Sequence, residues 1–315
     1  MLTAYAAGLS SDNPLGGLVV GELPAPEAEP GWTVVDVRAA TLNHHDLWSL
    51  RGVGLGTDRL PMVLGTDAAG VTADGREVVV HAVIGGLPGT DLPRSILSER
   101  YPGTLAQQVA VPTVNLVDKP AGMGFAQASC VPTAYLTAYR MLFRSGRATP
   151  GQRVLIQGAG GGVSSAAVVL AAHAGLEVVV TSRSAAKRER ALQLGAAQAV
   201  EPGTRIGRVD LVIETVGAAT WSHSVRSVRP GGTIVVAGAT TGDPSAMEIS
   251  RIFFTEITVV GATMGTRDEL GLVLTFLDRA GIEPVIDRRF PLTRAHEAFA
   301  ALAAGDGFGK IVVEP

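Results

Sequence analysis

The sequence predicts an α/β protein in which a doubly wound parallel sheet is joined to a discontinuous, mainly β domain. Between residues 153 and 263, short apolar strands alternate with helical stretches, which is the pattern of a parallel sheet with crossover helices. Before residue 120 and after residue 265, short strands are instead separated by proline and glycine. A chain of 315 residues is long enough for two domains of ordinary size.

The central domain is predicted to span residues 121–264. Its apolar runs have the lengths and spacing of strand–helix–strand units. We expect strands at 153–157, 177–181, 209–214, 233–237 and 257–261, and helices at 162–174, 185–194 and 218–228.

The second domain is predicted to combine residues 1–120 with residues 265–315, because the tail repeats the strand pattern of the beginning. Thr266 and Glu269 have the spacing of a capping box, and apolar residues then recur at helical spacing as far as Leu277. We also expect strands at 32–38, 77–81, 108–112, 285–290 and 310–313, and a helix at 294–304.

Charge and composition restrict the possible partners. A formal charge of −3 and an isoelectric point of about 6.1 provide no broad basic surface, which argues against nucleic acid and anionic membranes. A small-molecule substrate is therefore expected. The single cysteine, Cys130, and an N-terminus without a long apolar segment indicate a reducing, cytoplasmic location.

The strongest motif is a glycine cluster that follows a buried strand. Residues 154–163 read Val-Leu-Ile-Gln-Gly-Ala-Gly-Gly-Gly-Val and lead into a helix. Glycines permit the tight turn and let backbone N–H groups approach a diphosphate at the positive end of that helix. Because a second strand follows at 177–181, the motif predicts a dinucleotide site rather than a simple glycine turn. The residues expected to bind the cofactor here are Gly158, Ala159, Gly160, Gly161, Gly162 and Val163.

The residues after the second strand indicate which dinucleotide binds. Sites for NAD place an acidic residue there, on the ribose hydroxyls. This chain instead reads Thr-Ser-Arg-Ser-Ala-Ala-Lys-Arg over 181–188, which puts two cations in a first helical turn where the dipole disfavours them. We therefore expect NADPH, with Ser182, Arg183 and Lys187 near its 2′-phosphate. The alternative is a solvated basic helix face.

Two later strands also end close to glycine. In an open parallel sheet, the carboxyl ends of the strands border the ligand crevice. We expect Thr215, Val216, Gly238 and Ala239 to lie near the cofactor, and simple turn geometry is the alternative for each of them.

Several segments carry a family resemblance when they are taken together. They are Ala-Thr-Leu-Asn-His-His-Asp at 40–46, Val-Leu-Gly-Thr-Asp-Ala-Ala-Gly at 63–70, Pro-Thr-Ala-Tyr-Leu-Thr-Ala-Tyr at 132–139, the glycine cluster, and Gly-Lys-Ile-Val-Val at 309–313. The chain resembles the medium-chain dehydrogenase/reductase superfamily, and within it the zinc-free quinone oxidoreductase and enoyl reductase branch. The resemblance implies a GroES-like catalytic domain formed by both chain ends and a Rossmann domain that binds the cofactor.

The resemblance also implies that no metal is bound. Zinc-dependent members carry Cys, His and Cys ligands where this chain has Asn43, Thr66 and Thr133, and residues 85–101 replace their cysteine-rich lobe without any cysteine. Without a metal to stabilise oxyanion charge, a quinone or an α,β-unsaturated carbonyl is the expected hydride acceptor. A carbonyl or alcohol dehydrogenase that works without metal and a non-catalytic, NADPH-binding redox sensor are the alternatives.

Two catalytic candidates lie at the start of an expected helix. Asn43 occupies the position of a lost zinc ligand and is expected near the nicotinamide; the alternative is that it caps the helix, with Asp46 completing the box. His45 stands where relatives carry a proton-relaying hydroxyl, and with an unperturbed pKa of about 6.5 it could donate a proton at neutral pH. A structural histidine is the alternative.

The remaining candidates lie in three other segments. Thr133 and Thr137 are expected at a helix start near the nicotinamide ribose, and Tyr135 is an alternative acid or a buried aromatic residue. Lys310 either reaches the cofactor or ends a surface turn. The apolar strand near residues 256–261 is expected at the edge of the Rossmann sheet, where it would pair with a second subunit in a homodimer.

Overall fold

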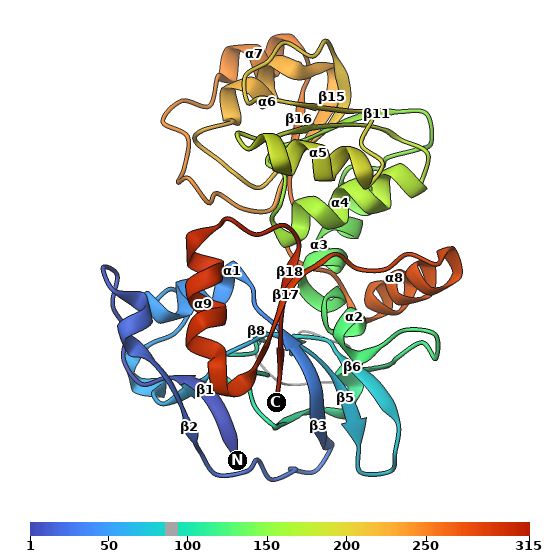
Figure 1. Cartoon of the computed structure of the whole chain (residues 1–315). Coiled ribbons are helices and arrows are strands. Elements are labelled where there is room, and N and C mark those ends of the chain that lie inside the picture. The colour runs from blue at the N-terminus through green and yellow to red at the C-terminus, as the bar shows by residue number, and fades with distance from the viewer. Residues whose placement is uncertain (86–93) are drawn as a thin grey trace. The chain divides into compact units, whose positions relative to one another are not determined.

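A computed structural model describes residues 1–85 and 94–315 (Figure 1). The chain divides into two compact units, Met1–Thr133 with Thr266–Pro315, and Ala134–Gly265. The C-terminal segment therefore belongs to the first unit. Within the described ranges, no helix is long and apolar enough to cross a membrane.

The first unit is mainly β structure. Its larger sheet has the order β10-β6-β5-β3-β18-β17, with β9 also paired to β3. Strand β18 lies antiparallel to β3, so both ends of the chain share one sheet. The strands are β1 (Leu2–Ala6), β2 (Leu18–Glu22), β3 (Trp32–Thr41), β4 (Met62–Val63), β5 (Asp67–Thr72), β6 (Glu77–Val80), β7 (Val83–Ile84), β8 (Ser95–Ile96), β9 (Gln108–Pro112), β10 (Leu116–Asp118), β17 (Ile286–Pro291) and β18 (Lys310–Glu314).

Four α-helices complete the described part of the first unit: α1 (His44–Leu50), α2 (Phe125–Ser129), α8 (Arg267–Ala280) and α9 (Ala295–Ala304). Helix α8 begins with the predicted capping box: Thr266 Oγ1 accepts from the Glu269 backbone N–H at 3.1 Å, and Glu269 Oε2 accepts from the Thr266 N–H at 2.8 Å. The unit extends beyond residue 120, where we place the boundary from sequence, because α2 packs against β3 and β5.

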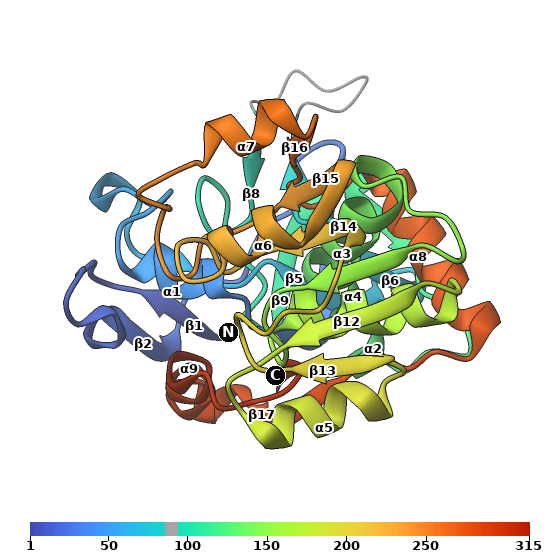
Figure 2. The same cartoon turned by 90° about the horizontal axis from the view of Figure 1, so that it is seen from above.

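The second unit is the doubly wound domain. Its six parallel strands have the order β13-β12-β11-β14-β15-β16, so the winding direction reverses between β11 and β14. Right-handed crossovers then place α4 and α5 on one face and α6 and α7 on the other (Figures 1 and 2). The elements are β11 (Arg153–Ile156), α4 (Gly162–His173), β12 (Glu177–Thr181), α5 (Ala185–Gln193), β13 (Gln198–Val200), β14 (Val209–Glu214), α6 (Trp221–Ser227), β15 (Val228–Val236), α7 (Ile249–Phe254) and β16 (Thr258–Gly261).

The expected fold class is confirmed. All five predicted strands and all three predicted helices of the central domain form, and β16 lies at the sheet edge as expected. Strand β13 and helix α7 were not predicted. The expected helix start near Thr133 is also wrong, because that residue lies inside a helical run that begins at Phe125. The run continues through two π-helical segments, Val131–Tyr135 and Arg140–Ser145, on either side of α3 (Leu136–Tyr139).

Candidate active site

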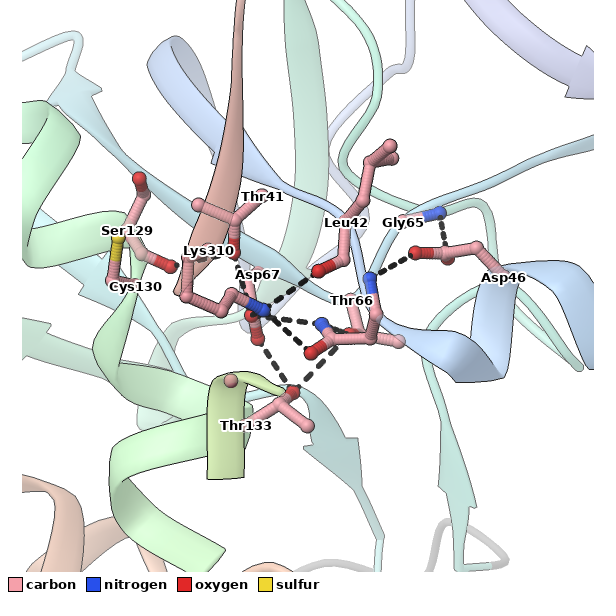
Figure 3. A network of polar contacts seen from close by, with 12 residues as sticks. Thr41, Leu42, Asp46, Gly65, Thr66, Asp67, Ser129, Cys130, Thr133 and Lys310 are labelled. Carbon is pink, nitrogen blue, oxygen red and sulfur yellow. Dashed lines mark hydrogen bonds and ion pairs between the residues drawn. The ribbon is translucent and has the colours of Figure 1, made fainter. Parts of the chain in front are cut away.

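A buried lysine is the centre of a polar network in the first unit (Figure 3). The Lys310 side chain, only 3% exposed, donates from Nζ to Leu42 O at 2.7 Å, to Asn43 Oδ1 at 2.6 Å and to Asp67 Oδ2 at 3.1 Å. It begins β18 directly after Gly309, whose φ of +111° and close approach to Val285 O leave no room for a side chain. Lys310 therefore does not end a surface turn.

The fully buried Asp67 carboxylate accepts hydrogen bonds from four side chains of this network. Its Oδ2 accepts from Thr41 Oγ1 and Asn43 Nδ2, both at 2.8 Å, in addition to Lys310, and its Oδ1 accepts from Thr133 Oγ1 at 2.5 Å. The buried charge is thus paired and hydrogen-bonded, as burial requires. Sequence reasoning missed Asp67, although an acidic residue at the start of an otherwise apolar segment was a usable signal.

Hydrogen bonds through Thr66 link Asn43 and Thr133, and these are the three positions where the resemblance implies zinc ligands in metal-dependent members. Asn43 Nδ2 donates to Thr66 Oγ1 at 3.0 Å, and Thr66 Oγ1 lies 3.2 Å from Thr133 Oγ1. Gly65 brings Thr66 into place with a φ of +95°, in a turn where a Cβ would lie 2.6 Å from Thr104 Oγ1. The structure therefore brings Asn43, Thr133 and Lys310 together, as three of the predicted site residues.

Asp46 connects this network to α1. Its Oδ2 accepts from the Asn43 backbone N–H at 2.8 Å and its Oδ1 from the Gly65 N–H at 3.0 Å, so the expected cap of α1 is present. Burial raises the pKa of Asp46 to about 7, against the opposing effect of these two hydrogen bonds. Asp46 therefore holds the Asn43 backbone, while the Asn43 side-chain amide forms its hydrogen bonds within the Lys310 network.

His45 does not have the titration behaviour that a neutral-pH proton donor needs. Burial lowers its pKa to about 4, while the Asp67 charge acts in the opposite direction. Its Nε2 lies 3.4 Å from Ser49 Oγ and 3.8 Å from Glu99 Oε1. The imidazole is therefore neutral at pH 7, and the expectation based on an unperturbed pKa was wrong.

Tyr135 and Thr137 lie in the second unit, outside the Lys310 network. Tyr135 is fully buried and Thr137 is 6% exposed. For Tyr135 the burial favours the packing role over the role of a catalytic acid.

The predicted cofactor turn has the geometry that a diphosphate requires. Gly158 and Gly160 have φ values of +78° and +109° between β11 and α4, and such values favour glycine strongly. The first turn of α4 leaves N–H groups without partners inside the helix, which gives an anion a place to bind. The Gly158 N–H is already used, because it donates to Thr181 Oγ1 at 3.1 Å. Residues 159–163 therefore supply the remaining donors of the turn.

A second buried network, which sequence reasoning missed, supports this turn. Gln157 accepts from Thr181 Oγ1 at 2.8 Å and donates to Ser224 Oγ at 2.9 Å, and Ser224 donates to Glu214 Oε2 at 2.6 Å. The buried Glu214 carboxylate also accepts from the N–H groups of Val216 and Gly217, at 2.8 and 3.1 Å. It thereby fixes the turn that contains two of the predicted cofactor residues, Thr215 and Val216. Gly238 packs beside this turn, where its Cβ would lie 3.2 Å from Thr215 O, and Ala239 follows it in the chain.

Three cations follow β12 in the basic segment. Arg188 donates to Ser182 O at 2.7 Å and pairs with Glu201 at 3.3 Å, so its guanidinium is committed to the protein. Arg183 is exposed, and the half-buried Lys187 lies in the first turn of α5, which Ser184 caps through the Lys187 N–H. Arg183 and Lys187 are the cations of this segment that the sequence predicts near the 2′-phosphate.

Comparison with known proteins places these features in a family. The family model described as zinc-binding dehydrogenase matches residues 162–279. The chain is 26% identical over 329 residues to an acryloyl-coenzyme A reductase of Sulfurisphaera tokodaii, covering 96% of this chain and 98% of that protein. It is 25% identical over 311 residues to a quinone oxidoreductase of Mus musculus, covering 92% and 91%. A crystal structure described as an NAD-dependent alcohol dehydrogenase matches all of both chains, with a TM-score of 0.93 and 29% identity. The chain belongs to the medium-chain dehydrogenase/reductase superfamily.

This superfamily assignment makes the chain an oxidoreductase. The chain is also 31% identical over 325 residues to the spectinabilin polyketide synthase system protein NorB of Streptomyces orinoci, but it spans only 14% of that protein's length.

The zinc in the name of the family model does not fit the residues of this chain. One amide and two hydroxyl groups occupy the three ligand positions, whereas zinc sites use thiolate, imidazole and carboxylate. Among residues 1–85 and 94–315, no three His, Cys, Asp or Glu side chains are grouped as metal ligands would be. The cysteine-free segment 85–101 lies partly outside the described residues, which resume at residue 94.

Proposed function

We propose that the protein is a zinc-independent, NADPH-dependent reductase that transfers hydride to a quinone or an α,β-unsaturated carbonyl. The observation that carries the proposal is the Lys310 network, which fills the zinc-ligand positions with an amide and two hydroxyls around a buried ammonium. Without a Lewis acid, an acceptor that delocalises its developing charge is favoured over a simple aldehyde or ketone.

The names of the relatives agree with this substrate class. Acryloyl-coenzyme A contains a C=C bond conjugated to a carbonyl, and so does the substrate named for a 2-methylene-furan-3-one reductase of Solanum lycopersicum, to which the chain is 29% identical. A quinone is likewise a conjugated dicarbonyl. These acceptors all take hydride in a way that spreads charge into an enolate or phenolate.

NADPH, when bound, would supply the hydride. Residues 159–163 would hold its diphosphate through backbone N–H groups at the start of α4. The Gln157–Glu214 network keeps that turn and the Thr215–Val216 turn in position, and Arg183 and Lys187 would bind the 2′-phosphate. His45, neutral at pH 7, is assigned no direct proton donation.

The direct test combines a substrate panel with metal analysis. Purified protein with NADPH is expected to reduce quinones and enones faster than saturated aldehydes, to retain its activity after dialysis against a chelator, and to contain zinc well below one atom per chain. Cofactor binding without NADPH consumption would support the redox sensor instead. Activity that depends on added zinc, or a preference for alcohols and NAD, would support the alcohol dehydrogenase alternative, which the name of the structural neighbour favours.

Lys187→Glu is expected to weaken NADPH binding at least about tenfold while changing NADH binding little, because only NADPH carries the 2′-phosphate. Fluorescence titration with both nucleotides measures the effect. Arg190→Glu is the matched control, because Arg190 is also a cation on α5. It is exposed and lies further than Lys187 from the N-terminus of this helix. Equal losses for NADPH and NADH would reject this role of Lys187.

We also propose a homodimer formed through the edge of the second unit. Strand β16 is one of the two edge strands of the parallel sheet, and Val259 on it is 38% exposed, while Phe253 and Phe254 of α7 are 59% and 78% exposed. An apolar edge of this kind favours pairing with a second copy. Phe254→Glu together with Val259→Lys is expected to convert the dimer to a monomer in light scattering. As a control, Leu272→Glu on α8, where Leu272 is 51% exposed, should leave the mass unchanged. A wild-type protein with monomeric mass would contradict the proposal.

A further inference from the structure

The Lys310 ammonium has one acceptor for each of its N–H bonds. An ammonium group has three N–H bonds, and three acceptors lie within 3.1 Å of Nζ: Leu42 O, Asn43 Oδ1 and Asp67 Oδ2. A neutral amine could satisfy only two of them. The three contacts therefore match the ammonium form of Lys310, which cannot give a proton to a substrate without losing one of these bonds.

This cation determines the orientation of the Asn43 amide. With Oδ1 directed at Lys310, Nδ2 donates to Thr66 Oγ1 and to Asp67 Oδ2. The flipped amide would oppose its NH₂ group to the ammonium and its oxygen to the carboxylate. Both N–H groups of Asn43 are consequently used inside the protein.

These bonds also determine which threonine hydroxyl donates in the contact between Thr66 and Thr133. Thr133 has a single hydroxyl proton, which lies on the 2.5 Å bond to Asp67 Oδ1. The 3.2 Å contact between Thr66 and Thr133 must therefore be donated by Thr66. The Thr133 hydroxyl proton is therefore used on Asp67, and the half-buried Thr133 offers a ligand an oxygen lone pair rather than a proton.

We propose that Lys310 is a positioning residue whose ammonium is an internal cation that fixes these donor directions, so that the former zinc-ligand positions present a hydrogen-bond acceptor to the bound ligands. The group it suits is a hydroxyl or amide N–H of the cofactor or substrate, and not a substrate carbonyl oxygen. This inference depends on the proposed function only for its kinetic readout, because the stability readout below needs no turnover.

The first test compares two buried lysines of the same unit. Lys310→Met is expected to lower kcat about tenfold to a hundredfold, since small misplacements at a reaction centre cost that much. The Kd for NADPH should change less than about threefold. Lys119→Met is the matched control: the Lys119 side chain is 4% exposed and pairs with Glu77 at 2.9 Å, so this variant should lose stability but keep kcat. A kcat for Lys310→Met within threefold of wild type would overturn the inference.

The second test restores the cation. Lys310→Ala removes the atoms of a propylamine, so n-propylammonium is expected to raise both the Tm and the kcat of this variant, while tetramethylammonium at equal ionic strength raises neither because it has no N–H. If both salts act equally, or neither raises the Tm, the inference is wrong. If propylammonium raises the Tm but even the wild type reduces no quinone or enone, the proposed function fails and the internal cation stands.

A third variant separates positioning from charge balance. Asp67→Asn/Lys310→Met removes both charges of the buried ion pair and is expected to fold even if Lys310→Ala does not. Because nothing then orients the Asn43 amide, kcat should stay at least about tenfold low. Full recovery of kcat in this double variant would mean that Lys310 only balances the charge of Asp67, and it would refute the positioning role.

Discussion

Asp67→Asn is expected to destabilise the protein by about 3–5 kcal/mol, which is the usual effect of leaving one member of a buried ion pair unpaired. The substitution puts an NH₂ or a neutral oxygen where Lys310 Nζ, Asn43 Nδ2 and Thr41 Oγ1 all donate to a carboxylate. The Lys310 ammonium, 3% exposed, would then have no counter-charge within bonding distance in the network. Chemical denaturation measures the change.

The double variant Asp67→Asn/Lys310→Met provides the control. A neutral pair of similar volume is often as stable as the buried ion pair it replaces, so the double variant should recover more than half of the lost free energy of unfolding. If the single variant loses less than about 1 kcal/mol, or if the second substitution makes the loss larger, the pair is not the stabilising interaction that the contacts indicate.

Gly160→Ala is expected to weaken NADPH binding by about tenfold to a hundredfold. Residue 160 has a φ of +109°, and a side chain in such a conformation costs about 1–3 kcal/mol, so the turn would relax to a different backbone path and redirect its N–H groups. Isothermal titration measures the Kd for NADPH and for NADH, and both should weaken, because both nucleotides carry the diphosphate.

Gly151→Ala is the matched control for this effect. Gly151 lies in the turn before β11, has a φ of +85°, and a Cβ added there would meet nothing within 4 Å beyond its chain neighbours. The substitution therefore introduces similar backbone strain at a position outside the predicted cofactor turn. This variant should lose comparable stability and keep its Kd. Unchanged NADPH binding in Gly160→Ala would show that the diphosphate lies elsewhere.

The chain pattern predicted the doubly wound unit well because the predicted strands are continuous apolar runs, and helix-length stretches follow β11, β12 and β14. The missed elements lack those signals. Strand β13 has only three residues, and none of them is fully buried. Helix α7 follows Glu248, which has a left-handed φ of +52° that its residue type does not predict. Strand β15 starts at Val228, earlier than expected, because the chain pairs with β14 across an irregularity that contains Pro230 and Gly231.

The sequence by itself determined the fold class, the glycine turn and the basic segment after β12, because each is a property of residue types at local spacings. The family resemblance added which positions carry zinc ligands in metal-dependent members, and the residue types there include no thiolate or imidazole. Only the tertiary structure decided what Lys310 and Asp67 do, since they are 243 residues apart in the chain and meet where β18 and β5 lie in one sheet. Burial likewise decided the protonation of His45, because a pKa depends on surroundings that many distant segments supply.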